Sequence, residues 1–171
     1  EARHPAAGAS GRNGGLVLLG MRDRYSEAIE RFGHDVAHEV WSATAENLRR
    51  MRGLVKRFNV EYQETGTVYP ATDAGEATIL RESTTALQRD GFGTEFTGQD
   101  TFDSGFAGVM FQPGDFTIQP AKLNWGLAEA SGAVLYENNE VFDIRRDGAA
   151  MVVRSRQNVV RCGKVVLAVN G

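Results

Sequence analysis

The run GASGRNGG at residues 8–15 constrains the chain more than any other stretch of its sequence. Four glycines in eight residues let the backbone approach another group closely and expose successive N–H groups. Ser10 adds a hydroxyl group, Arg12 a cation and Asn13 an amide. Such a loop can hold a phosphate or the edge of a polar ring. A Gly-rich surface turn is the alternative interpretation, because a Gly-rich loop by itself is a weak signal.

Hydrophobic spacing in the first part of the chain predicts helices joined by short strands. Apolar residues recur at helical spacing after Ser26, which suits the N-cap, and predict one bent helix or two consecutive helices. A second helical pattern places Leu80, Thr84 and Leu87 on one face. The elements expected before Pro120 are a loop at 1–20 with a strand at 16–19, the helical stretch to 58, a strand at 62–69, a helix at 73–89 and a strand at 109–111.

The second part of the chain combines one helix with a β-rich tail. Pro120 suits the first helical position, because its missing N–H has no partner there, and Gly132 ends the helix. The pair Asp147-Gly148 between two apolar runs predicts a β-hairpin. The expected strands are 133–136, 141–145, 150–155, 159–162 and 165–169, the last a continuous apolar run typical of a buried central parallel strand. This mixture predicts an α/β or α+β fold.

Composition argues against several classes of partner. The net charge of −3 gives no basic field for nucleic acid and no polybasic anchor for a membrane surface. No apolar run reaches the length of a membrane span. Cys162 is the one cysteine, which rules out an intrachain disulfide and fits a reducing compartment, so we expect a cytoplasmic protein.

A few other side chains have simpler interpretations than catalysis. His34 and His38 lie four residues apart in a predicted helix, a spacing that could place two imidazoles on one metal ion. No third ligand is evident in the sequence, so solvated or partly buried histidines are preferred and no metal site is assigned. Trp41 and Trp125 are interpreted as packing residues, and Cys162 as a small buried hydrophobe.

Residues 8–15 resemble the flavin-contacting loop of the D-amino-acid-oxidase-like (DAO) superfamily of FAD-dependent oxidoreductases. The resemblance is closest to the branch of gamma-glutamylputrescine oxidoreductase and related amine oxidoreductases. In that family the loop follows the second strand of a Rossmann unit, and an acid at the end of that strand holds the adenosine ribose. Glu1 stands at this position, and a carboxylate can accept hydrogen bonds from two adjacent hydroxyl groups. The cofactor-binding residues implied here are Glu1, Ala9, Ser10, Arg12, Asn13, Gly14 and Gly15.

Two later segments extend the resemblance. PGDFTIQPAKLNWGLAEASGAVLYENNEV is similar to the family's substrate-side strand, Pro-initiated helix and strand toward the adenine, which places the backbone of Val141 against the adenine. VVLAVNG is similar to the strand and turn beneath the dinucleotide, although this pattern is generic across flavoproteins. It implies Ala168 and Gly171 as further cofactor-binding residues. Residues 21–106 match the family only in pattern.

The resemblance implies a two-domain, Rossmann-like FAD-binding flavoprotein with α/β architecture and α+β elements. Residues 1–20 and 121–171 would belong to the FAD-binding domain, and residues 21–120 mainly to the substrate domain. The implied reaction is oxidative deamination of a small-molecule amine or amino acid, by hydride transfer to FAD. No catalytic residue is assigned, because in this chemistry the protein mainly positions the substrate and tunes the flavin.

We also expect the chain to be an internal segment of such a protein. The GxGxxG turn that cradles the pyrophosphate is not found in the sequence. The chain alone is therefore expected to bind FAD weakly or not at all and to be inactive. Without a neighbouring strand, the run 165–169 would leave an unpaired edge that favours self-association. The alternative is a non-catalytic α/β module that acts by protein–protein interaction.

Overall fold

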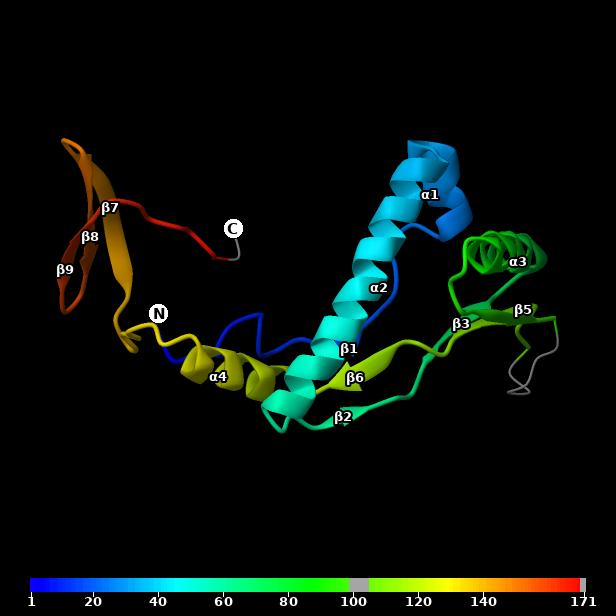
Figure 1. Ribbon diagram of the computed structural model, residues 1–171, viewed down its shortest axis with the longest axis horizontal. Helices are drawn as coiled ribbons and strands as arrows, with labels where there is room; N and C mark the ends of the chain where they lie inside the picture. The colour runs from blue at the N-terminus through cyan, green and yellow to red at the C-terminus, as the bar shows by residue number, and fades with distance from the viewer. Residues whose placement is uncertain (99–104, 170–171) are drawn as a thin grey trace. The chain divides into compact units, whose positions relative to one another are not determined.

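The computed structural model describes residues 1–98 and 105–169, which form two compact units (Figure 1). Unit 2 is the continuous segment Gly15–Gln119. Unit 1 combines Glu1–Gly14 with Pro120–Gly171, so the first and last parts of the chain fold together. Among the described residues, no helix is both long enough and apolar enough to cross a membrane.

The long helical pattern forms two consecutive helices, α1 (Tyr25–Phe32) and α2 (His34–Arg57). Gly33 separates them with a φ of 85°, a backbone region that favours glycine. The prediction of Ser26 as N-cap is wrong, because Arg24 occupies that position. The Arg24 N–H donates to the Glu27 carboxylate at 2.7 Å, whereas the Ser26 hydroxyl lies inside the helix, 2.7 Å from the Ser83 hydroxyl.

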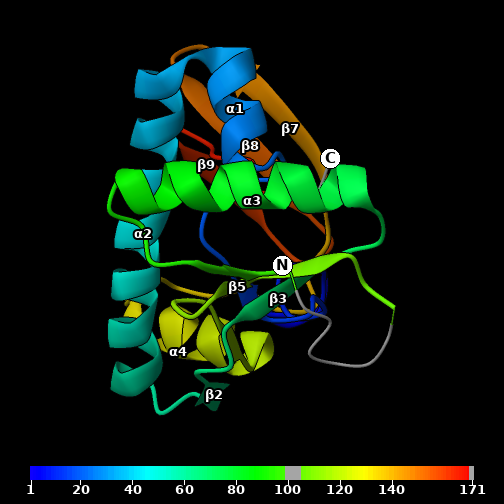
Figure 2. The ribbon, with the colours of Figure 1, turned by 90° about the vertical axis from the view of Figure 1, so that its right-hand side faces the viewer.

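Helix α3 (Ala74–Arg89) confirms the second helical pattern. The Asp73 side chain caps it by accepting the Glu76 N–H at 2.9 Å. The predicted face of Leu80, Thr84 and Leu87 is buried. Figure 2 shows α3 lying over strands β3 (Thr67–Ala71) and β5 (Gly108–Gln112), with α1 and α2 beside it.

Unit 2 contains two antiparallel sheets of three strands each. The first has the order β1-β6-β2 and the second the order β3-β5-β4. The predicted strand at 62–69 is instead two strands that belong to different sheets, because the chain turns at Gly66 with a φ of 65°. Pro70 lies on an edge strand, where its missing N–H leaves no gap in the ladder. The strands are β1 (Leu16–Val17), β2 (Tyr62–Gln63), β3 (Thr67–Ala71), β4 (Glu95–Thr97), β5 (Gly108–Gln112) and β6 (Phe116–Ile118).

The core of unit 2 has two clusters of buried side chains. In the larger one, Tyr25 of α1 packs against Trp41 of α2 with ring centroids 4.8 Å apart, alongside Leu80 and Met110. The smaller one joins β1, α2 and β6. The interpretation of Trp41 as a packing residue is confirmed, since its exposed fraction is 3%.

Unit 1 consists of α4 (Pro120–Ala130) and an antiparallel sheet in the order β7-β8-β9. The strands are β7 (Val141–Asp147), β8 (Ala150–Ser155) and β9 (Val159–Cys162). Helix initiation at Pro120 and the predicted hairpin are confirmed. Gly132 and Gly148 have positive φ values of 66° and 61°, as expected of residues that end a helix and form a tight turn.

Two predicted strands of unit 1 are absent from the described structure. Residues 133–136 and 165–169 have no strand conformation, and no described strand pairs with either segment. The apolar run at 165–169 is exposed, with Val166 at 88% and Leu167 at 69%. An apolar run predicts burial only where neighbouring strands can pair with it and cover it, and the described strands supply no such partners.

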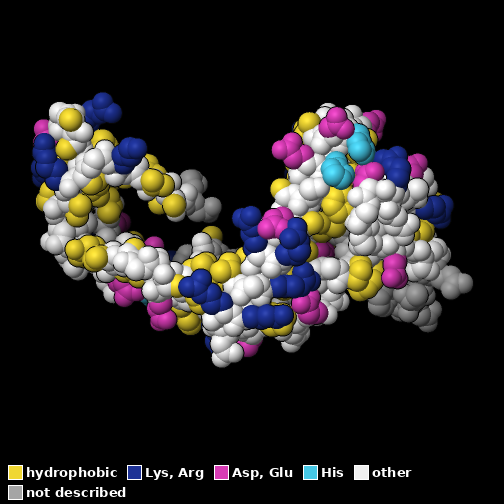
Figure 3. Space-filling view, viewed as in Figure 1, with side chains coloured by type: hydrophobic (Ala, Val, Ile, Leu, Met, Phe, Trp, Pro, Cys, Tyr) yellow, Lys and Arg dark blue, Asp and Glu magenta, His cyan; other side chains and the backbone are white. Residues whose placement is uncertain are grey.

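Little of unit 1 is buried. Among its described residues, only Ala7, Leu123 and Asn139 are buried, and Figure 3 shows hydrophobic side chains on the surface around β7–β9. The interpretation of Trp125 as a packing residue is wrong, because it is 46% exposed and uses its indole N–H to hold a loop. Cys162 is half-buried.

Candidate functional site

The glycine-rich loop of unit 1 is ordered by hydrogen bonds to its carbonyl oxygens. Five loop carbonyls accept a donor from the same unit. The pairs are Trp125 Nε1 to Pro5 O (3.0 Å), Arg3 Nη2 to Ala7 O (2.9 Å), Gly11 N to Gly8 O (3.2 Å), Arg12 N (3.3 Å) and Asn13 Nδ2 (3.1 Å) to Ala9 O, and Asn13 Nδ2 (2.9 Å) and Asn124 Nδ2 (3.0 Å) to Ser10 O. These five acceptors are therefore occupied by the protein.

Three consecutive amide groups of the same loop are not occupied by the described protein. The N–H groups of Gly8, Ala9 and Ser10 have no acceptor among the described residues, and all three residues are exposed. The exposed side chain of Arg12 follows them in the chain. Because these N–H donors are exposed and unpaired within the described protein, they are available to a ligand that is rich in hydrogen-bond acceptors.

Glycine is required at two positions of this loop for steric reasons. A Cβ atom at Gly11 would lie 2.1 Å from the Ala6 carbonyl oxygen, which is far inside van der Waals contact. Gly15 has a φ of 68° and is buried at the start of unit 2, where its carbonyl accepts the Ile118 N–H at 2.9 Å. Glycine is therefore required at position 11 for the shape of the loop, and at position 15 for the backbone that enters the following sheet.

A groove of about 590 Å³ is the second feature of unit 1. Glu1 and Glu140 contribute carboxylates to its wall, and the remaining lining is largely apolar. The N-terminal segment is fixed beside residues 136–139, since the Glu1 amino group donates to Tyr136 O at 3.0 Å and the Asn138 N–H donates to Arg3 O at 2.7 Å. The apolar lining residues are Ala2, Val141, Ile144, Val153 and residues 165–169.

The residues predicted to bind a cofactor fall into separate places. The groove brings together Glu1, Val141 and Ala168, which come from three distant parts of the sequence. The loop carries Ala9, Ser10, Arg12, Asn13 and Gly14, none of which lines this groove. Gly15 belongs to unit 2, and Gly171 lies outside the described residues.

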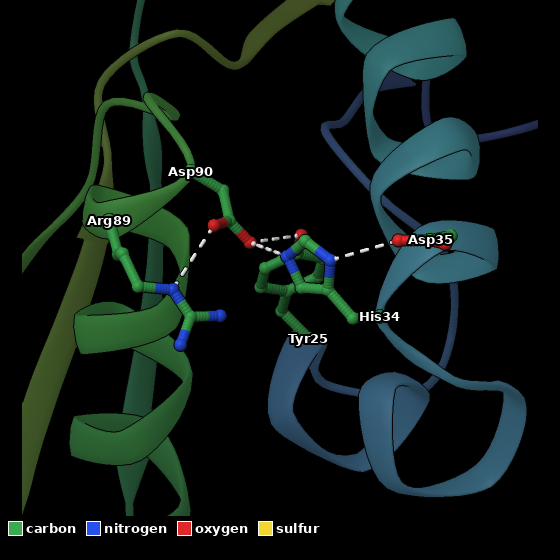
Figure 4. Close-up of polar contacts among 5 residues, drawn as sticks. All are labelled: Tyr25, His34, Asp35, Arg89 and Asp90. Carbon is green, nitrogen blue, oxygen red and sulfur yellow. Dashed lines mark hydrogen bonds and ion pairs between the residues drawn. The ribbon is translucent and has the colours of Figure 1, made fainter.

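Unit 2 contains a polar cluster that sequence reasoning missed (Figure 4). Asp90, at the C-terminal end of α3, accepts hydrogen bonds from the Tyr25 hydroxyl at 2.6 Å and from Arg89 Nε at 3.2 Å. His34 Nε2 lies 2.9 Å from the same carboxylate, and His34 Nδ1 lies 3.3 Å from Asp35. Tyr25 and Asp90 are 65 positions apart, so only the packing of α1 and α2 against α3 reveals the cluster.

The cluster shifts the pKa values of its members in opposite directions. The hydrogen bond from Tyr25, followed by that from Arg89, lowers the pKa of Asp90 well below its ordinary value. Burial and the bond to Asp90 raise the pKa of Tyr25. The contact with Asp90, followed by that with Asp35, raises the pKa of His34. His38 stacks on His34 with ring centroids 5.9 Å apart, and no group of three or more metal-ligand side chains occurs in the described part of the chain.

Comparison with known proteins defines the class. Residues 1–171 match the family DAO, FAD dependent oxidoreductase, and the chain therefore belongs to this family. It is 23% identical over 179 residues to the probable oxidoreductase OrdL of Haemophilus influenzae, an alignment that covers 95% of this chain and 40% of that protein. The family relationship and the α/β fold class inferred from the sequence are confirmed.

Solved structures agree on the fold. Glycine oxidase from Geobacillus kaustophilus has a TM-score of 0.70 and 26% identity, over 98% of this chain and 47% of that one. L-amino acid deaminase from Proteus vulgaris has a TM-score of 0.72 and 13% identity, over 98% and 40% of the two chains, and shows the fold alone. The chain thus spans less than half the length of these proteins.

The residues of unit 1 fit FAD in two places. FAD carries acceptor atoms on its pyrophosphate and ring edge, which match the donors of Gly8, Ala9 and Ser10. It also carries an adenosine with two adjacent ribose hydroxyls, which match a groove that combines the Glu1 carboxylate with an apolar wall. The donor chemistry at the loop and the mixed lining of the groove are both those that this cofactor requires.

Proposed function

We propose that this chain supplies part of the FAD site of an oxidoreductase that oxidises an amine or an amino acid. One observation carries the proposal: five carbonyls within residues 5–10 are occupied by protein donors, while the N–H groups of Gly8, Ala9 and Ser10 remain available. The name of the similar glycine oxidase supports an amino acid as the substrate class. Bound FAD would supply the acceptor for the hydride removed from the carbon beside the substrate nitrogen.

The proposed roles follow the chemistry of each residue. The loop residues Ala9, Ser10, Asn13, Gly14 and Gly15 would lie at the flavin end. Arg12 would add a positive charge that favours anionic groups at this loop. We assign no catalytic base to any described residue.

The groove would hold the other end of the cofactor. The Glu1 carboxylate would accept hydrogen bonds from the ribose, the Val141 backbone would lie against the adenine, and Ala168 and Gly171 would lie beneath the dinucleotide. We further propose that residues 1–20 and 121–171 contribute to an FAD-binding domain and residues 21–120 mainly to a substrate domain. The grouping of both ends of the chain in unit 1 supports this division.

We propose that the chain alone binds FAD weakly and does not turn over substrate. The groove is lined on one side by the exposed segment 165–169, and the chain contains no GxGxxG turn for the pyrophosphate. Weak binding would still be specific, because the loop and the groove each offer matched groups.

A glycine substitution tests the loop. A Cβ atom at Gly8 would meet no atom within 4 Å, so Gly8→Val should fold normally while its side chain covers the amide row. Fluorescence anisotropy of FAD, measured at increasing protein concentration, should show roughly tenfold weaker binding for Gly8→Val than for the wild type. Gly93→Val is the matched control, because Gly93 lies in unit 2 and also has no atom within 4 Å of an added Cβ.

Two outcomes of this titration would contradict the proposal. Equal FAD affinity in the Gly8→Val variant and the wild type would remove the loop from the site. Submicromolar affinity of the unmodified chain would contradict weak binding. Gly15 is unsuitable for this purpose, because it is buried in unit 2 with a positive φ and its substitution would also disturb the sheet.

The second candidate function is a non-catalytic module that binds a protein partner. The observation in its favour is the exposed apolar surface of unit 1, where Val134, Phe142 and Val166 are 78%, 67% and 88% exposed. FAD binding that depends on Gly8 favours the first function. Absence of FAD binding to the chain favours the second function.

A further inference from the structure

Two consecutive residues of α4 hold the segment 5–10, which includes the start of the glycine-rich loop, at both of its ends. Asn124 Nδ2 donates to the Ser10 carbonyl at 3.0 Å and to the Pro120 carbonyl at 2.8 Å. Trp125 Nε1 donates to the Pro5 carbonyl at 3.0 Å. These contacts span the loop from Pro5 to Ser10 and lie entirely within unit 1.

We propose that Asn124 and Trp125 are positioning residues, here called the α4 clamp, that present the amide row of the loop to the cofactor. The inference rests on the proposed function for the identity of the ligand. It goes beyond that function by assigning the orientation of the loop amides to two side chains that would not themselves contact FAD.

The planarity of the peptide unit explains the orientation of the amide row that the clamp holds in place. In a trans peptide the C=O of one residue and the N–H of the next point in opposite directions, and the described chain has no cis peptide. The carbonyls of Ala7, Gly8 and Ala9 are held by donors of unit 1, so the N–H groups of Gly8, Ala9 and Ser10 are directed away from those donors. Fixing these carbonyls therefore also fixes the direction of the N–H groups that follow them.

The clamp fixes the carbonyls of Pro5 and Ser10, which lie at the two ends of the segment that contains this row of amides. Without Asn124, the Ser10 carbonyl would keep only the Asn13 amide, which belongs to the loop itself and moves with it. Without the Trp125 N–H, the Pro5 carbonyl would keep only the contact with His4 Nδ1 at 3.1 Å, which belongs to the same segment and moves with it. Without these two anchors the segment between Pro5 and Ser10 could shift, and the N–H groups of Gly8, Ala9 and Ser10 would shift with it.

The test uses variants that remove the donors and otherwise change the side chains as little as possible. Asn124→Asp replaces the amide donor by a carboxylate that faces two carbonyls, and Trp125→Phe removes the indole N–H while keeping an aromatic ring. Glu129→Ala is the matched control, because Glu129 is exposed on the same helix and its side chain forms no hydrogen bond or ion pair with the described residues. Each variant is compared with the wild-type chain by nuclear magnetic resonance.

The first readout needs no cofactor. Amide hydrogen exchange at Gly11 and Arg12, whose N–H groups bond within the loop, should be about fivefold to tenfold faster in Asn124→Asp than in the wild type, and unchanged in Glu129→Ala. Trp125→Phe should speed exchange at Ala7, whose N–H bonds to the His4 carbonyl. Unchanged exchange in both clamp variants overturns the proposal, whether or not the chain binds FAD.

The second readout separates positioning from a general loss of structure. On addition of FAD, Asn124→Asp should lose the shifts at Gly8, Ala9 and Ser10 but keep those at Val141 in the groove. Loss of both sets would mean a merely structural role and would overturn the proposal, as would retention of both. If the wild-type chain shows no FAD-induced shift at all, the proposed function fails, and the exchange measurement alone decides whether the clamp holds the loop.

Discussion

The hydrogen bond between Tyr25 and Asp90 should be a large single contributor to the stability of unit 2. The hydroxyl and the carboxylate are 2.6 Å apart, Tyr25 is 1% exposed and the Asp90 side chain is 9% exposed. A hydrogen bond to a charged group in such a setting stabilises the folded state by about 1.5–3 kcal/mol. Tyr25→Phe should lower the free energy of unfolding by that amount.

Removing the other partner should cost more. Asp90→Ala leaves the buried Tyr25 hydroxyl without its described acceptor, which costs about 2–4 kcal/mol once desolvation is included. The double variant should then be less destabilised than the sum of the two single variants by about 1.5–2 kcal/mol, because the interaction can be lost only once. Asp90→Asn is the conservative control, since its amide oxygen can still accept the Tyr25 hydroxyl proton.

Urea denaturation followed by Trp41 fluorescence gives these energies. Trp41 packs on the Tyr25 ring, and a Trp125→Phe background removes the fluorophore of unit 1. Single-variant energies that add within about 0.5 kcal/mol would refute the reasoning, because they would mean that the two groups do not interact in the folded chain.

Four further outcomes follow from the structure. The pKa of His34 is raised, so its contribution to stability is fully present below about pH 6.5, the ordinary pKa of an unfolded histidine, and is lost as pH rises through the raised pKa. The urea midpoint of unit 2 should therefore fall as pH rises across this window. His34→Gln should abolish that fall. The opposite sign holds for Asp90, whose contribution is present above about pH 4 and is lost on acidification, so an acid transition that is unchanged in Asp90→Asn would contradict its lowered pKa. Gly66→Ala should destabilise unit 2 by about 2–4 kcal/mol in the same denaturation assay, because its φ is 65° and a Cβ would lie 2.4 Å from the Phe111 ring; a wild-type midpoint would contradict this. Val166→Lys should reduce self-association of the chain in analytical ultracentrifugation, since Val166 is 88% exposed, and equal sedimentation of variant and wild type would rule out this run as the contact.

Local signals in the sequence identified the elements that local chemistry determines. Helix α3 has a capping aspartate and a regular apolar face, α4 begins at a proline, and the β7–β8 hairpin turns at Asp147-Gly148. Each of these signals lies within a few residues of its consequence. The family relationship was accessible for the same reason, because the loop at residues 8–15 is a contiguous motif.

Features that depend on distant partners were not accessible. The run 165–169 has the composition of a buried strand, but burial depends on neighbours that the described chain does not provide. The Tyr25–Asp90 bond joins α1 to the end of α3, and neither residue has an unusual sequence context. The contact from Asn124 to Ser10 spans 114 positions, so its role is visible only when α4 lies beside the loop.

The central claim is that unit 1 carries two separate parts of an FAD site, the loop and the groove. Nuclear magnetic resonance titration of the chain with the two halves of the cofactor, flavin mononucleotide and adenosine monophosphate, tests it most directly. Flavin mononucleotide should shift the amides of Gly8, Ala9 and Ser10, adenosine monophosphate should shift those of Val141 and Ala168, and FAD should shift both sets. Shifts confined to unit 2, or the same residues responding to both halves, would contradict the account.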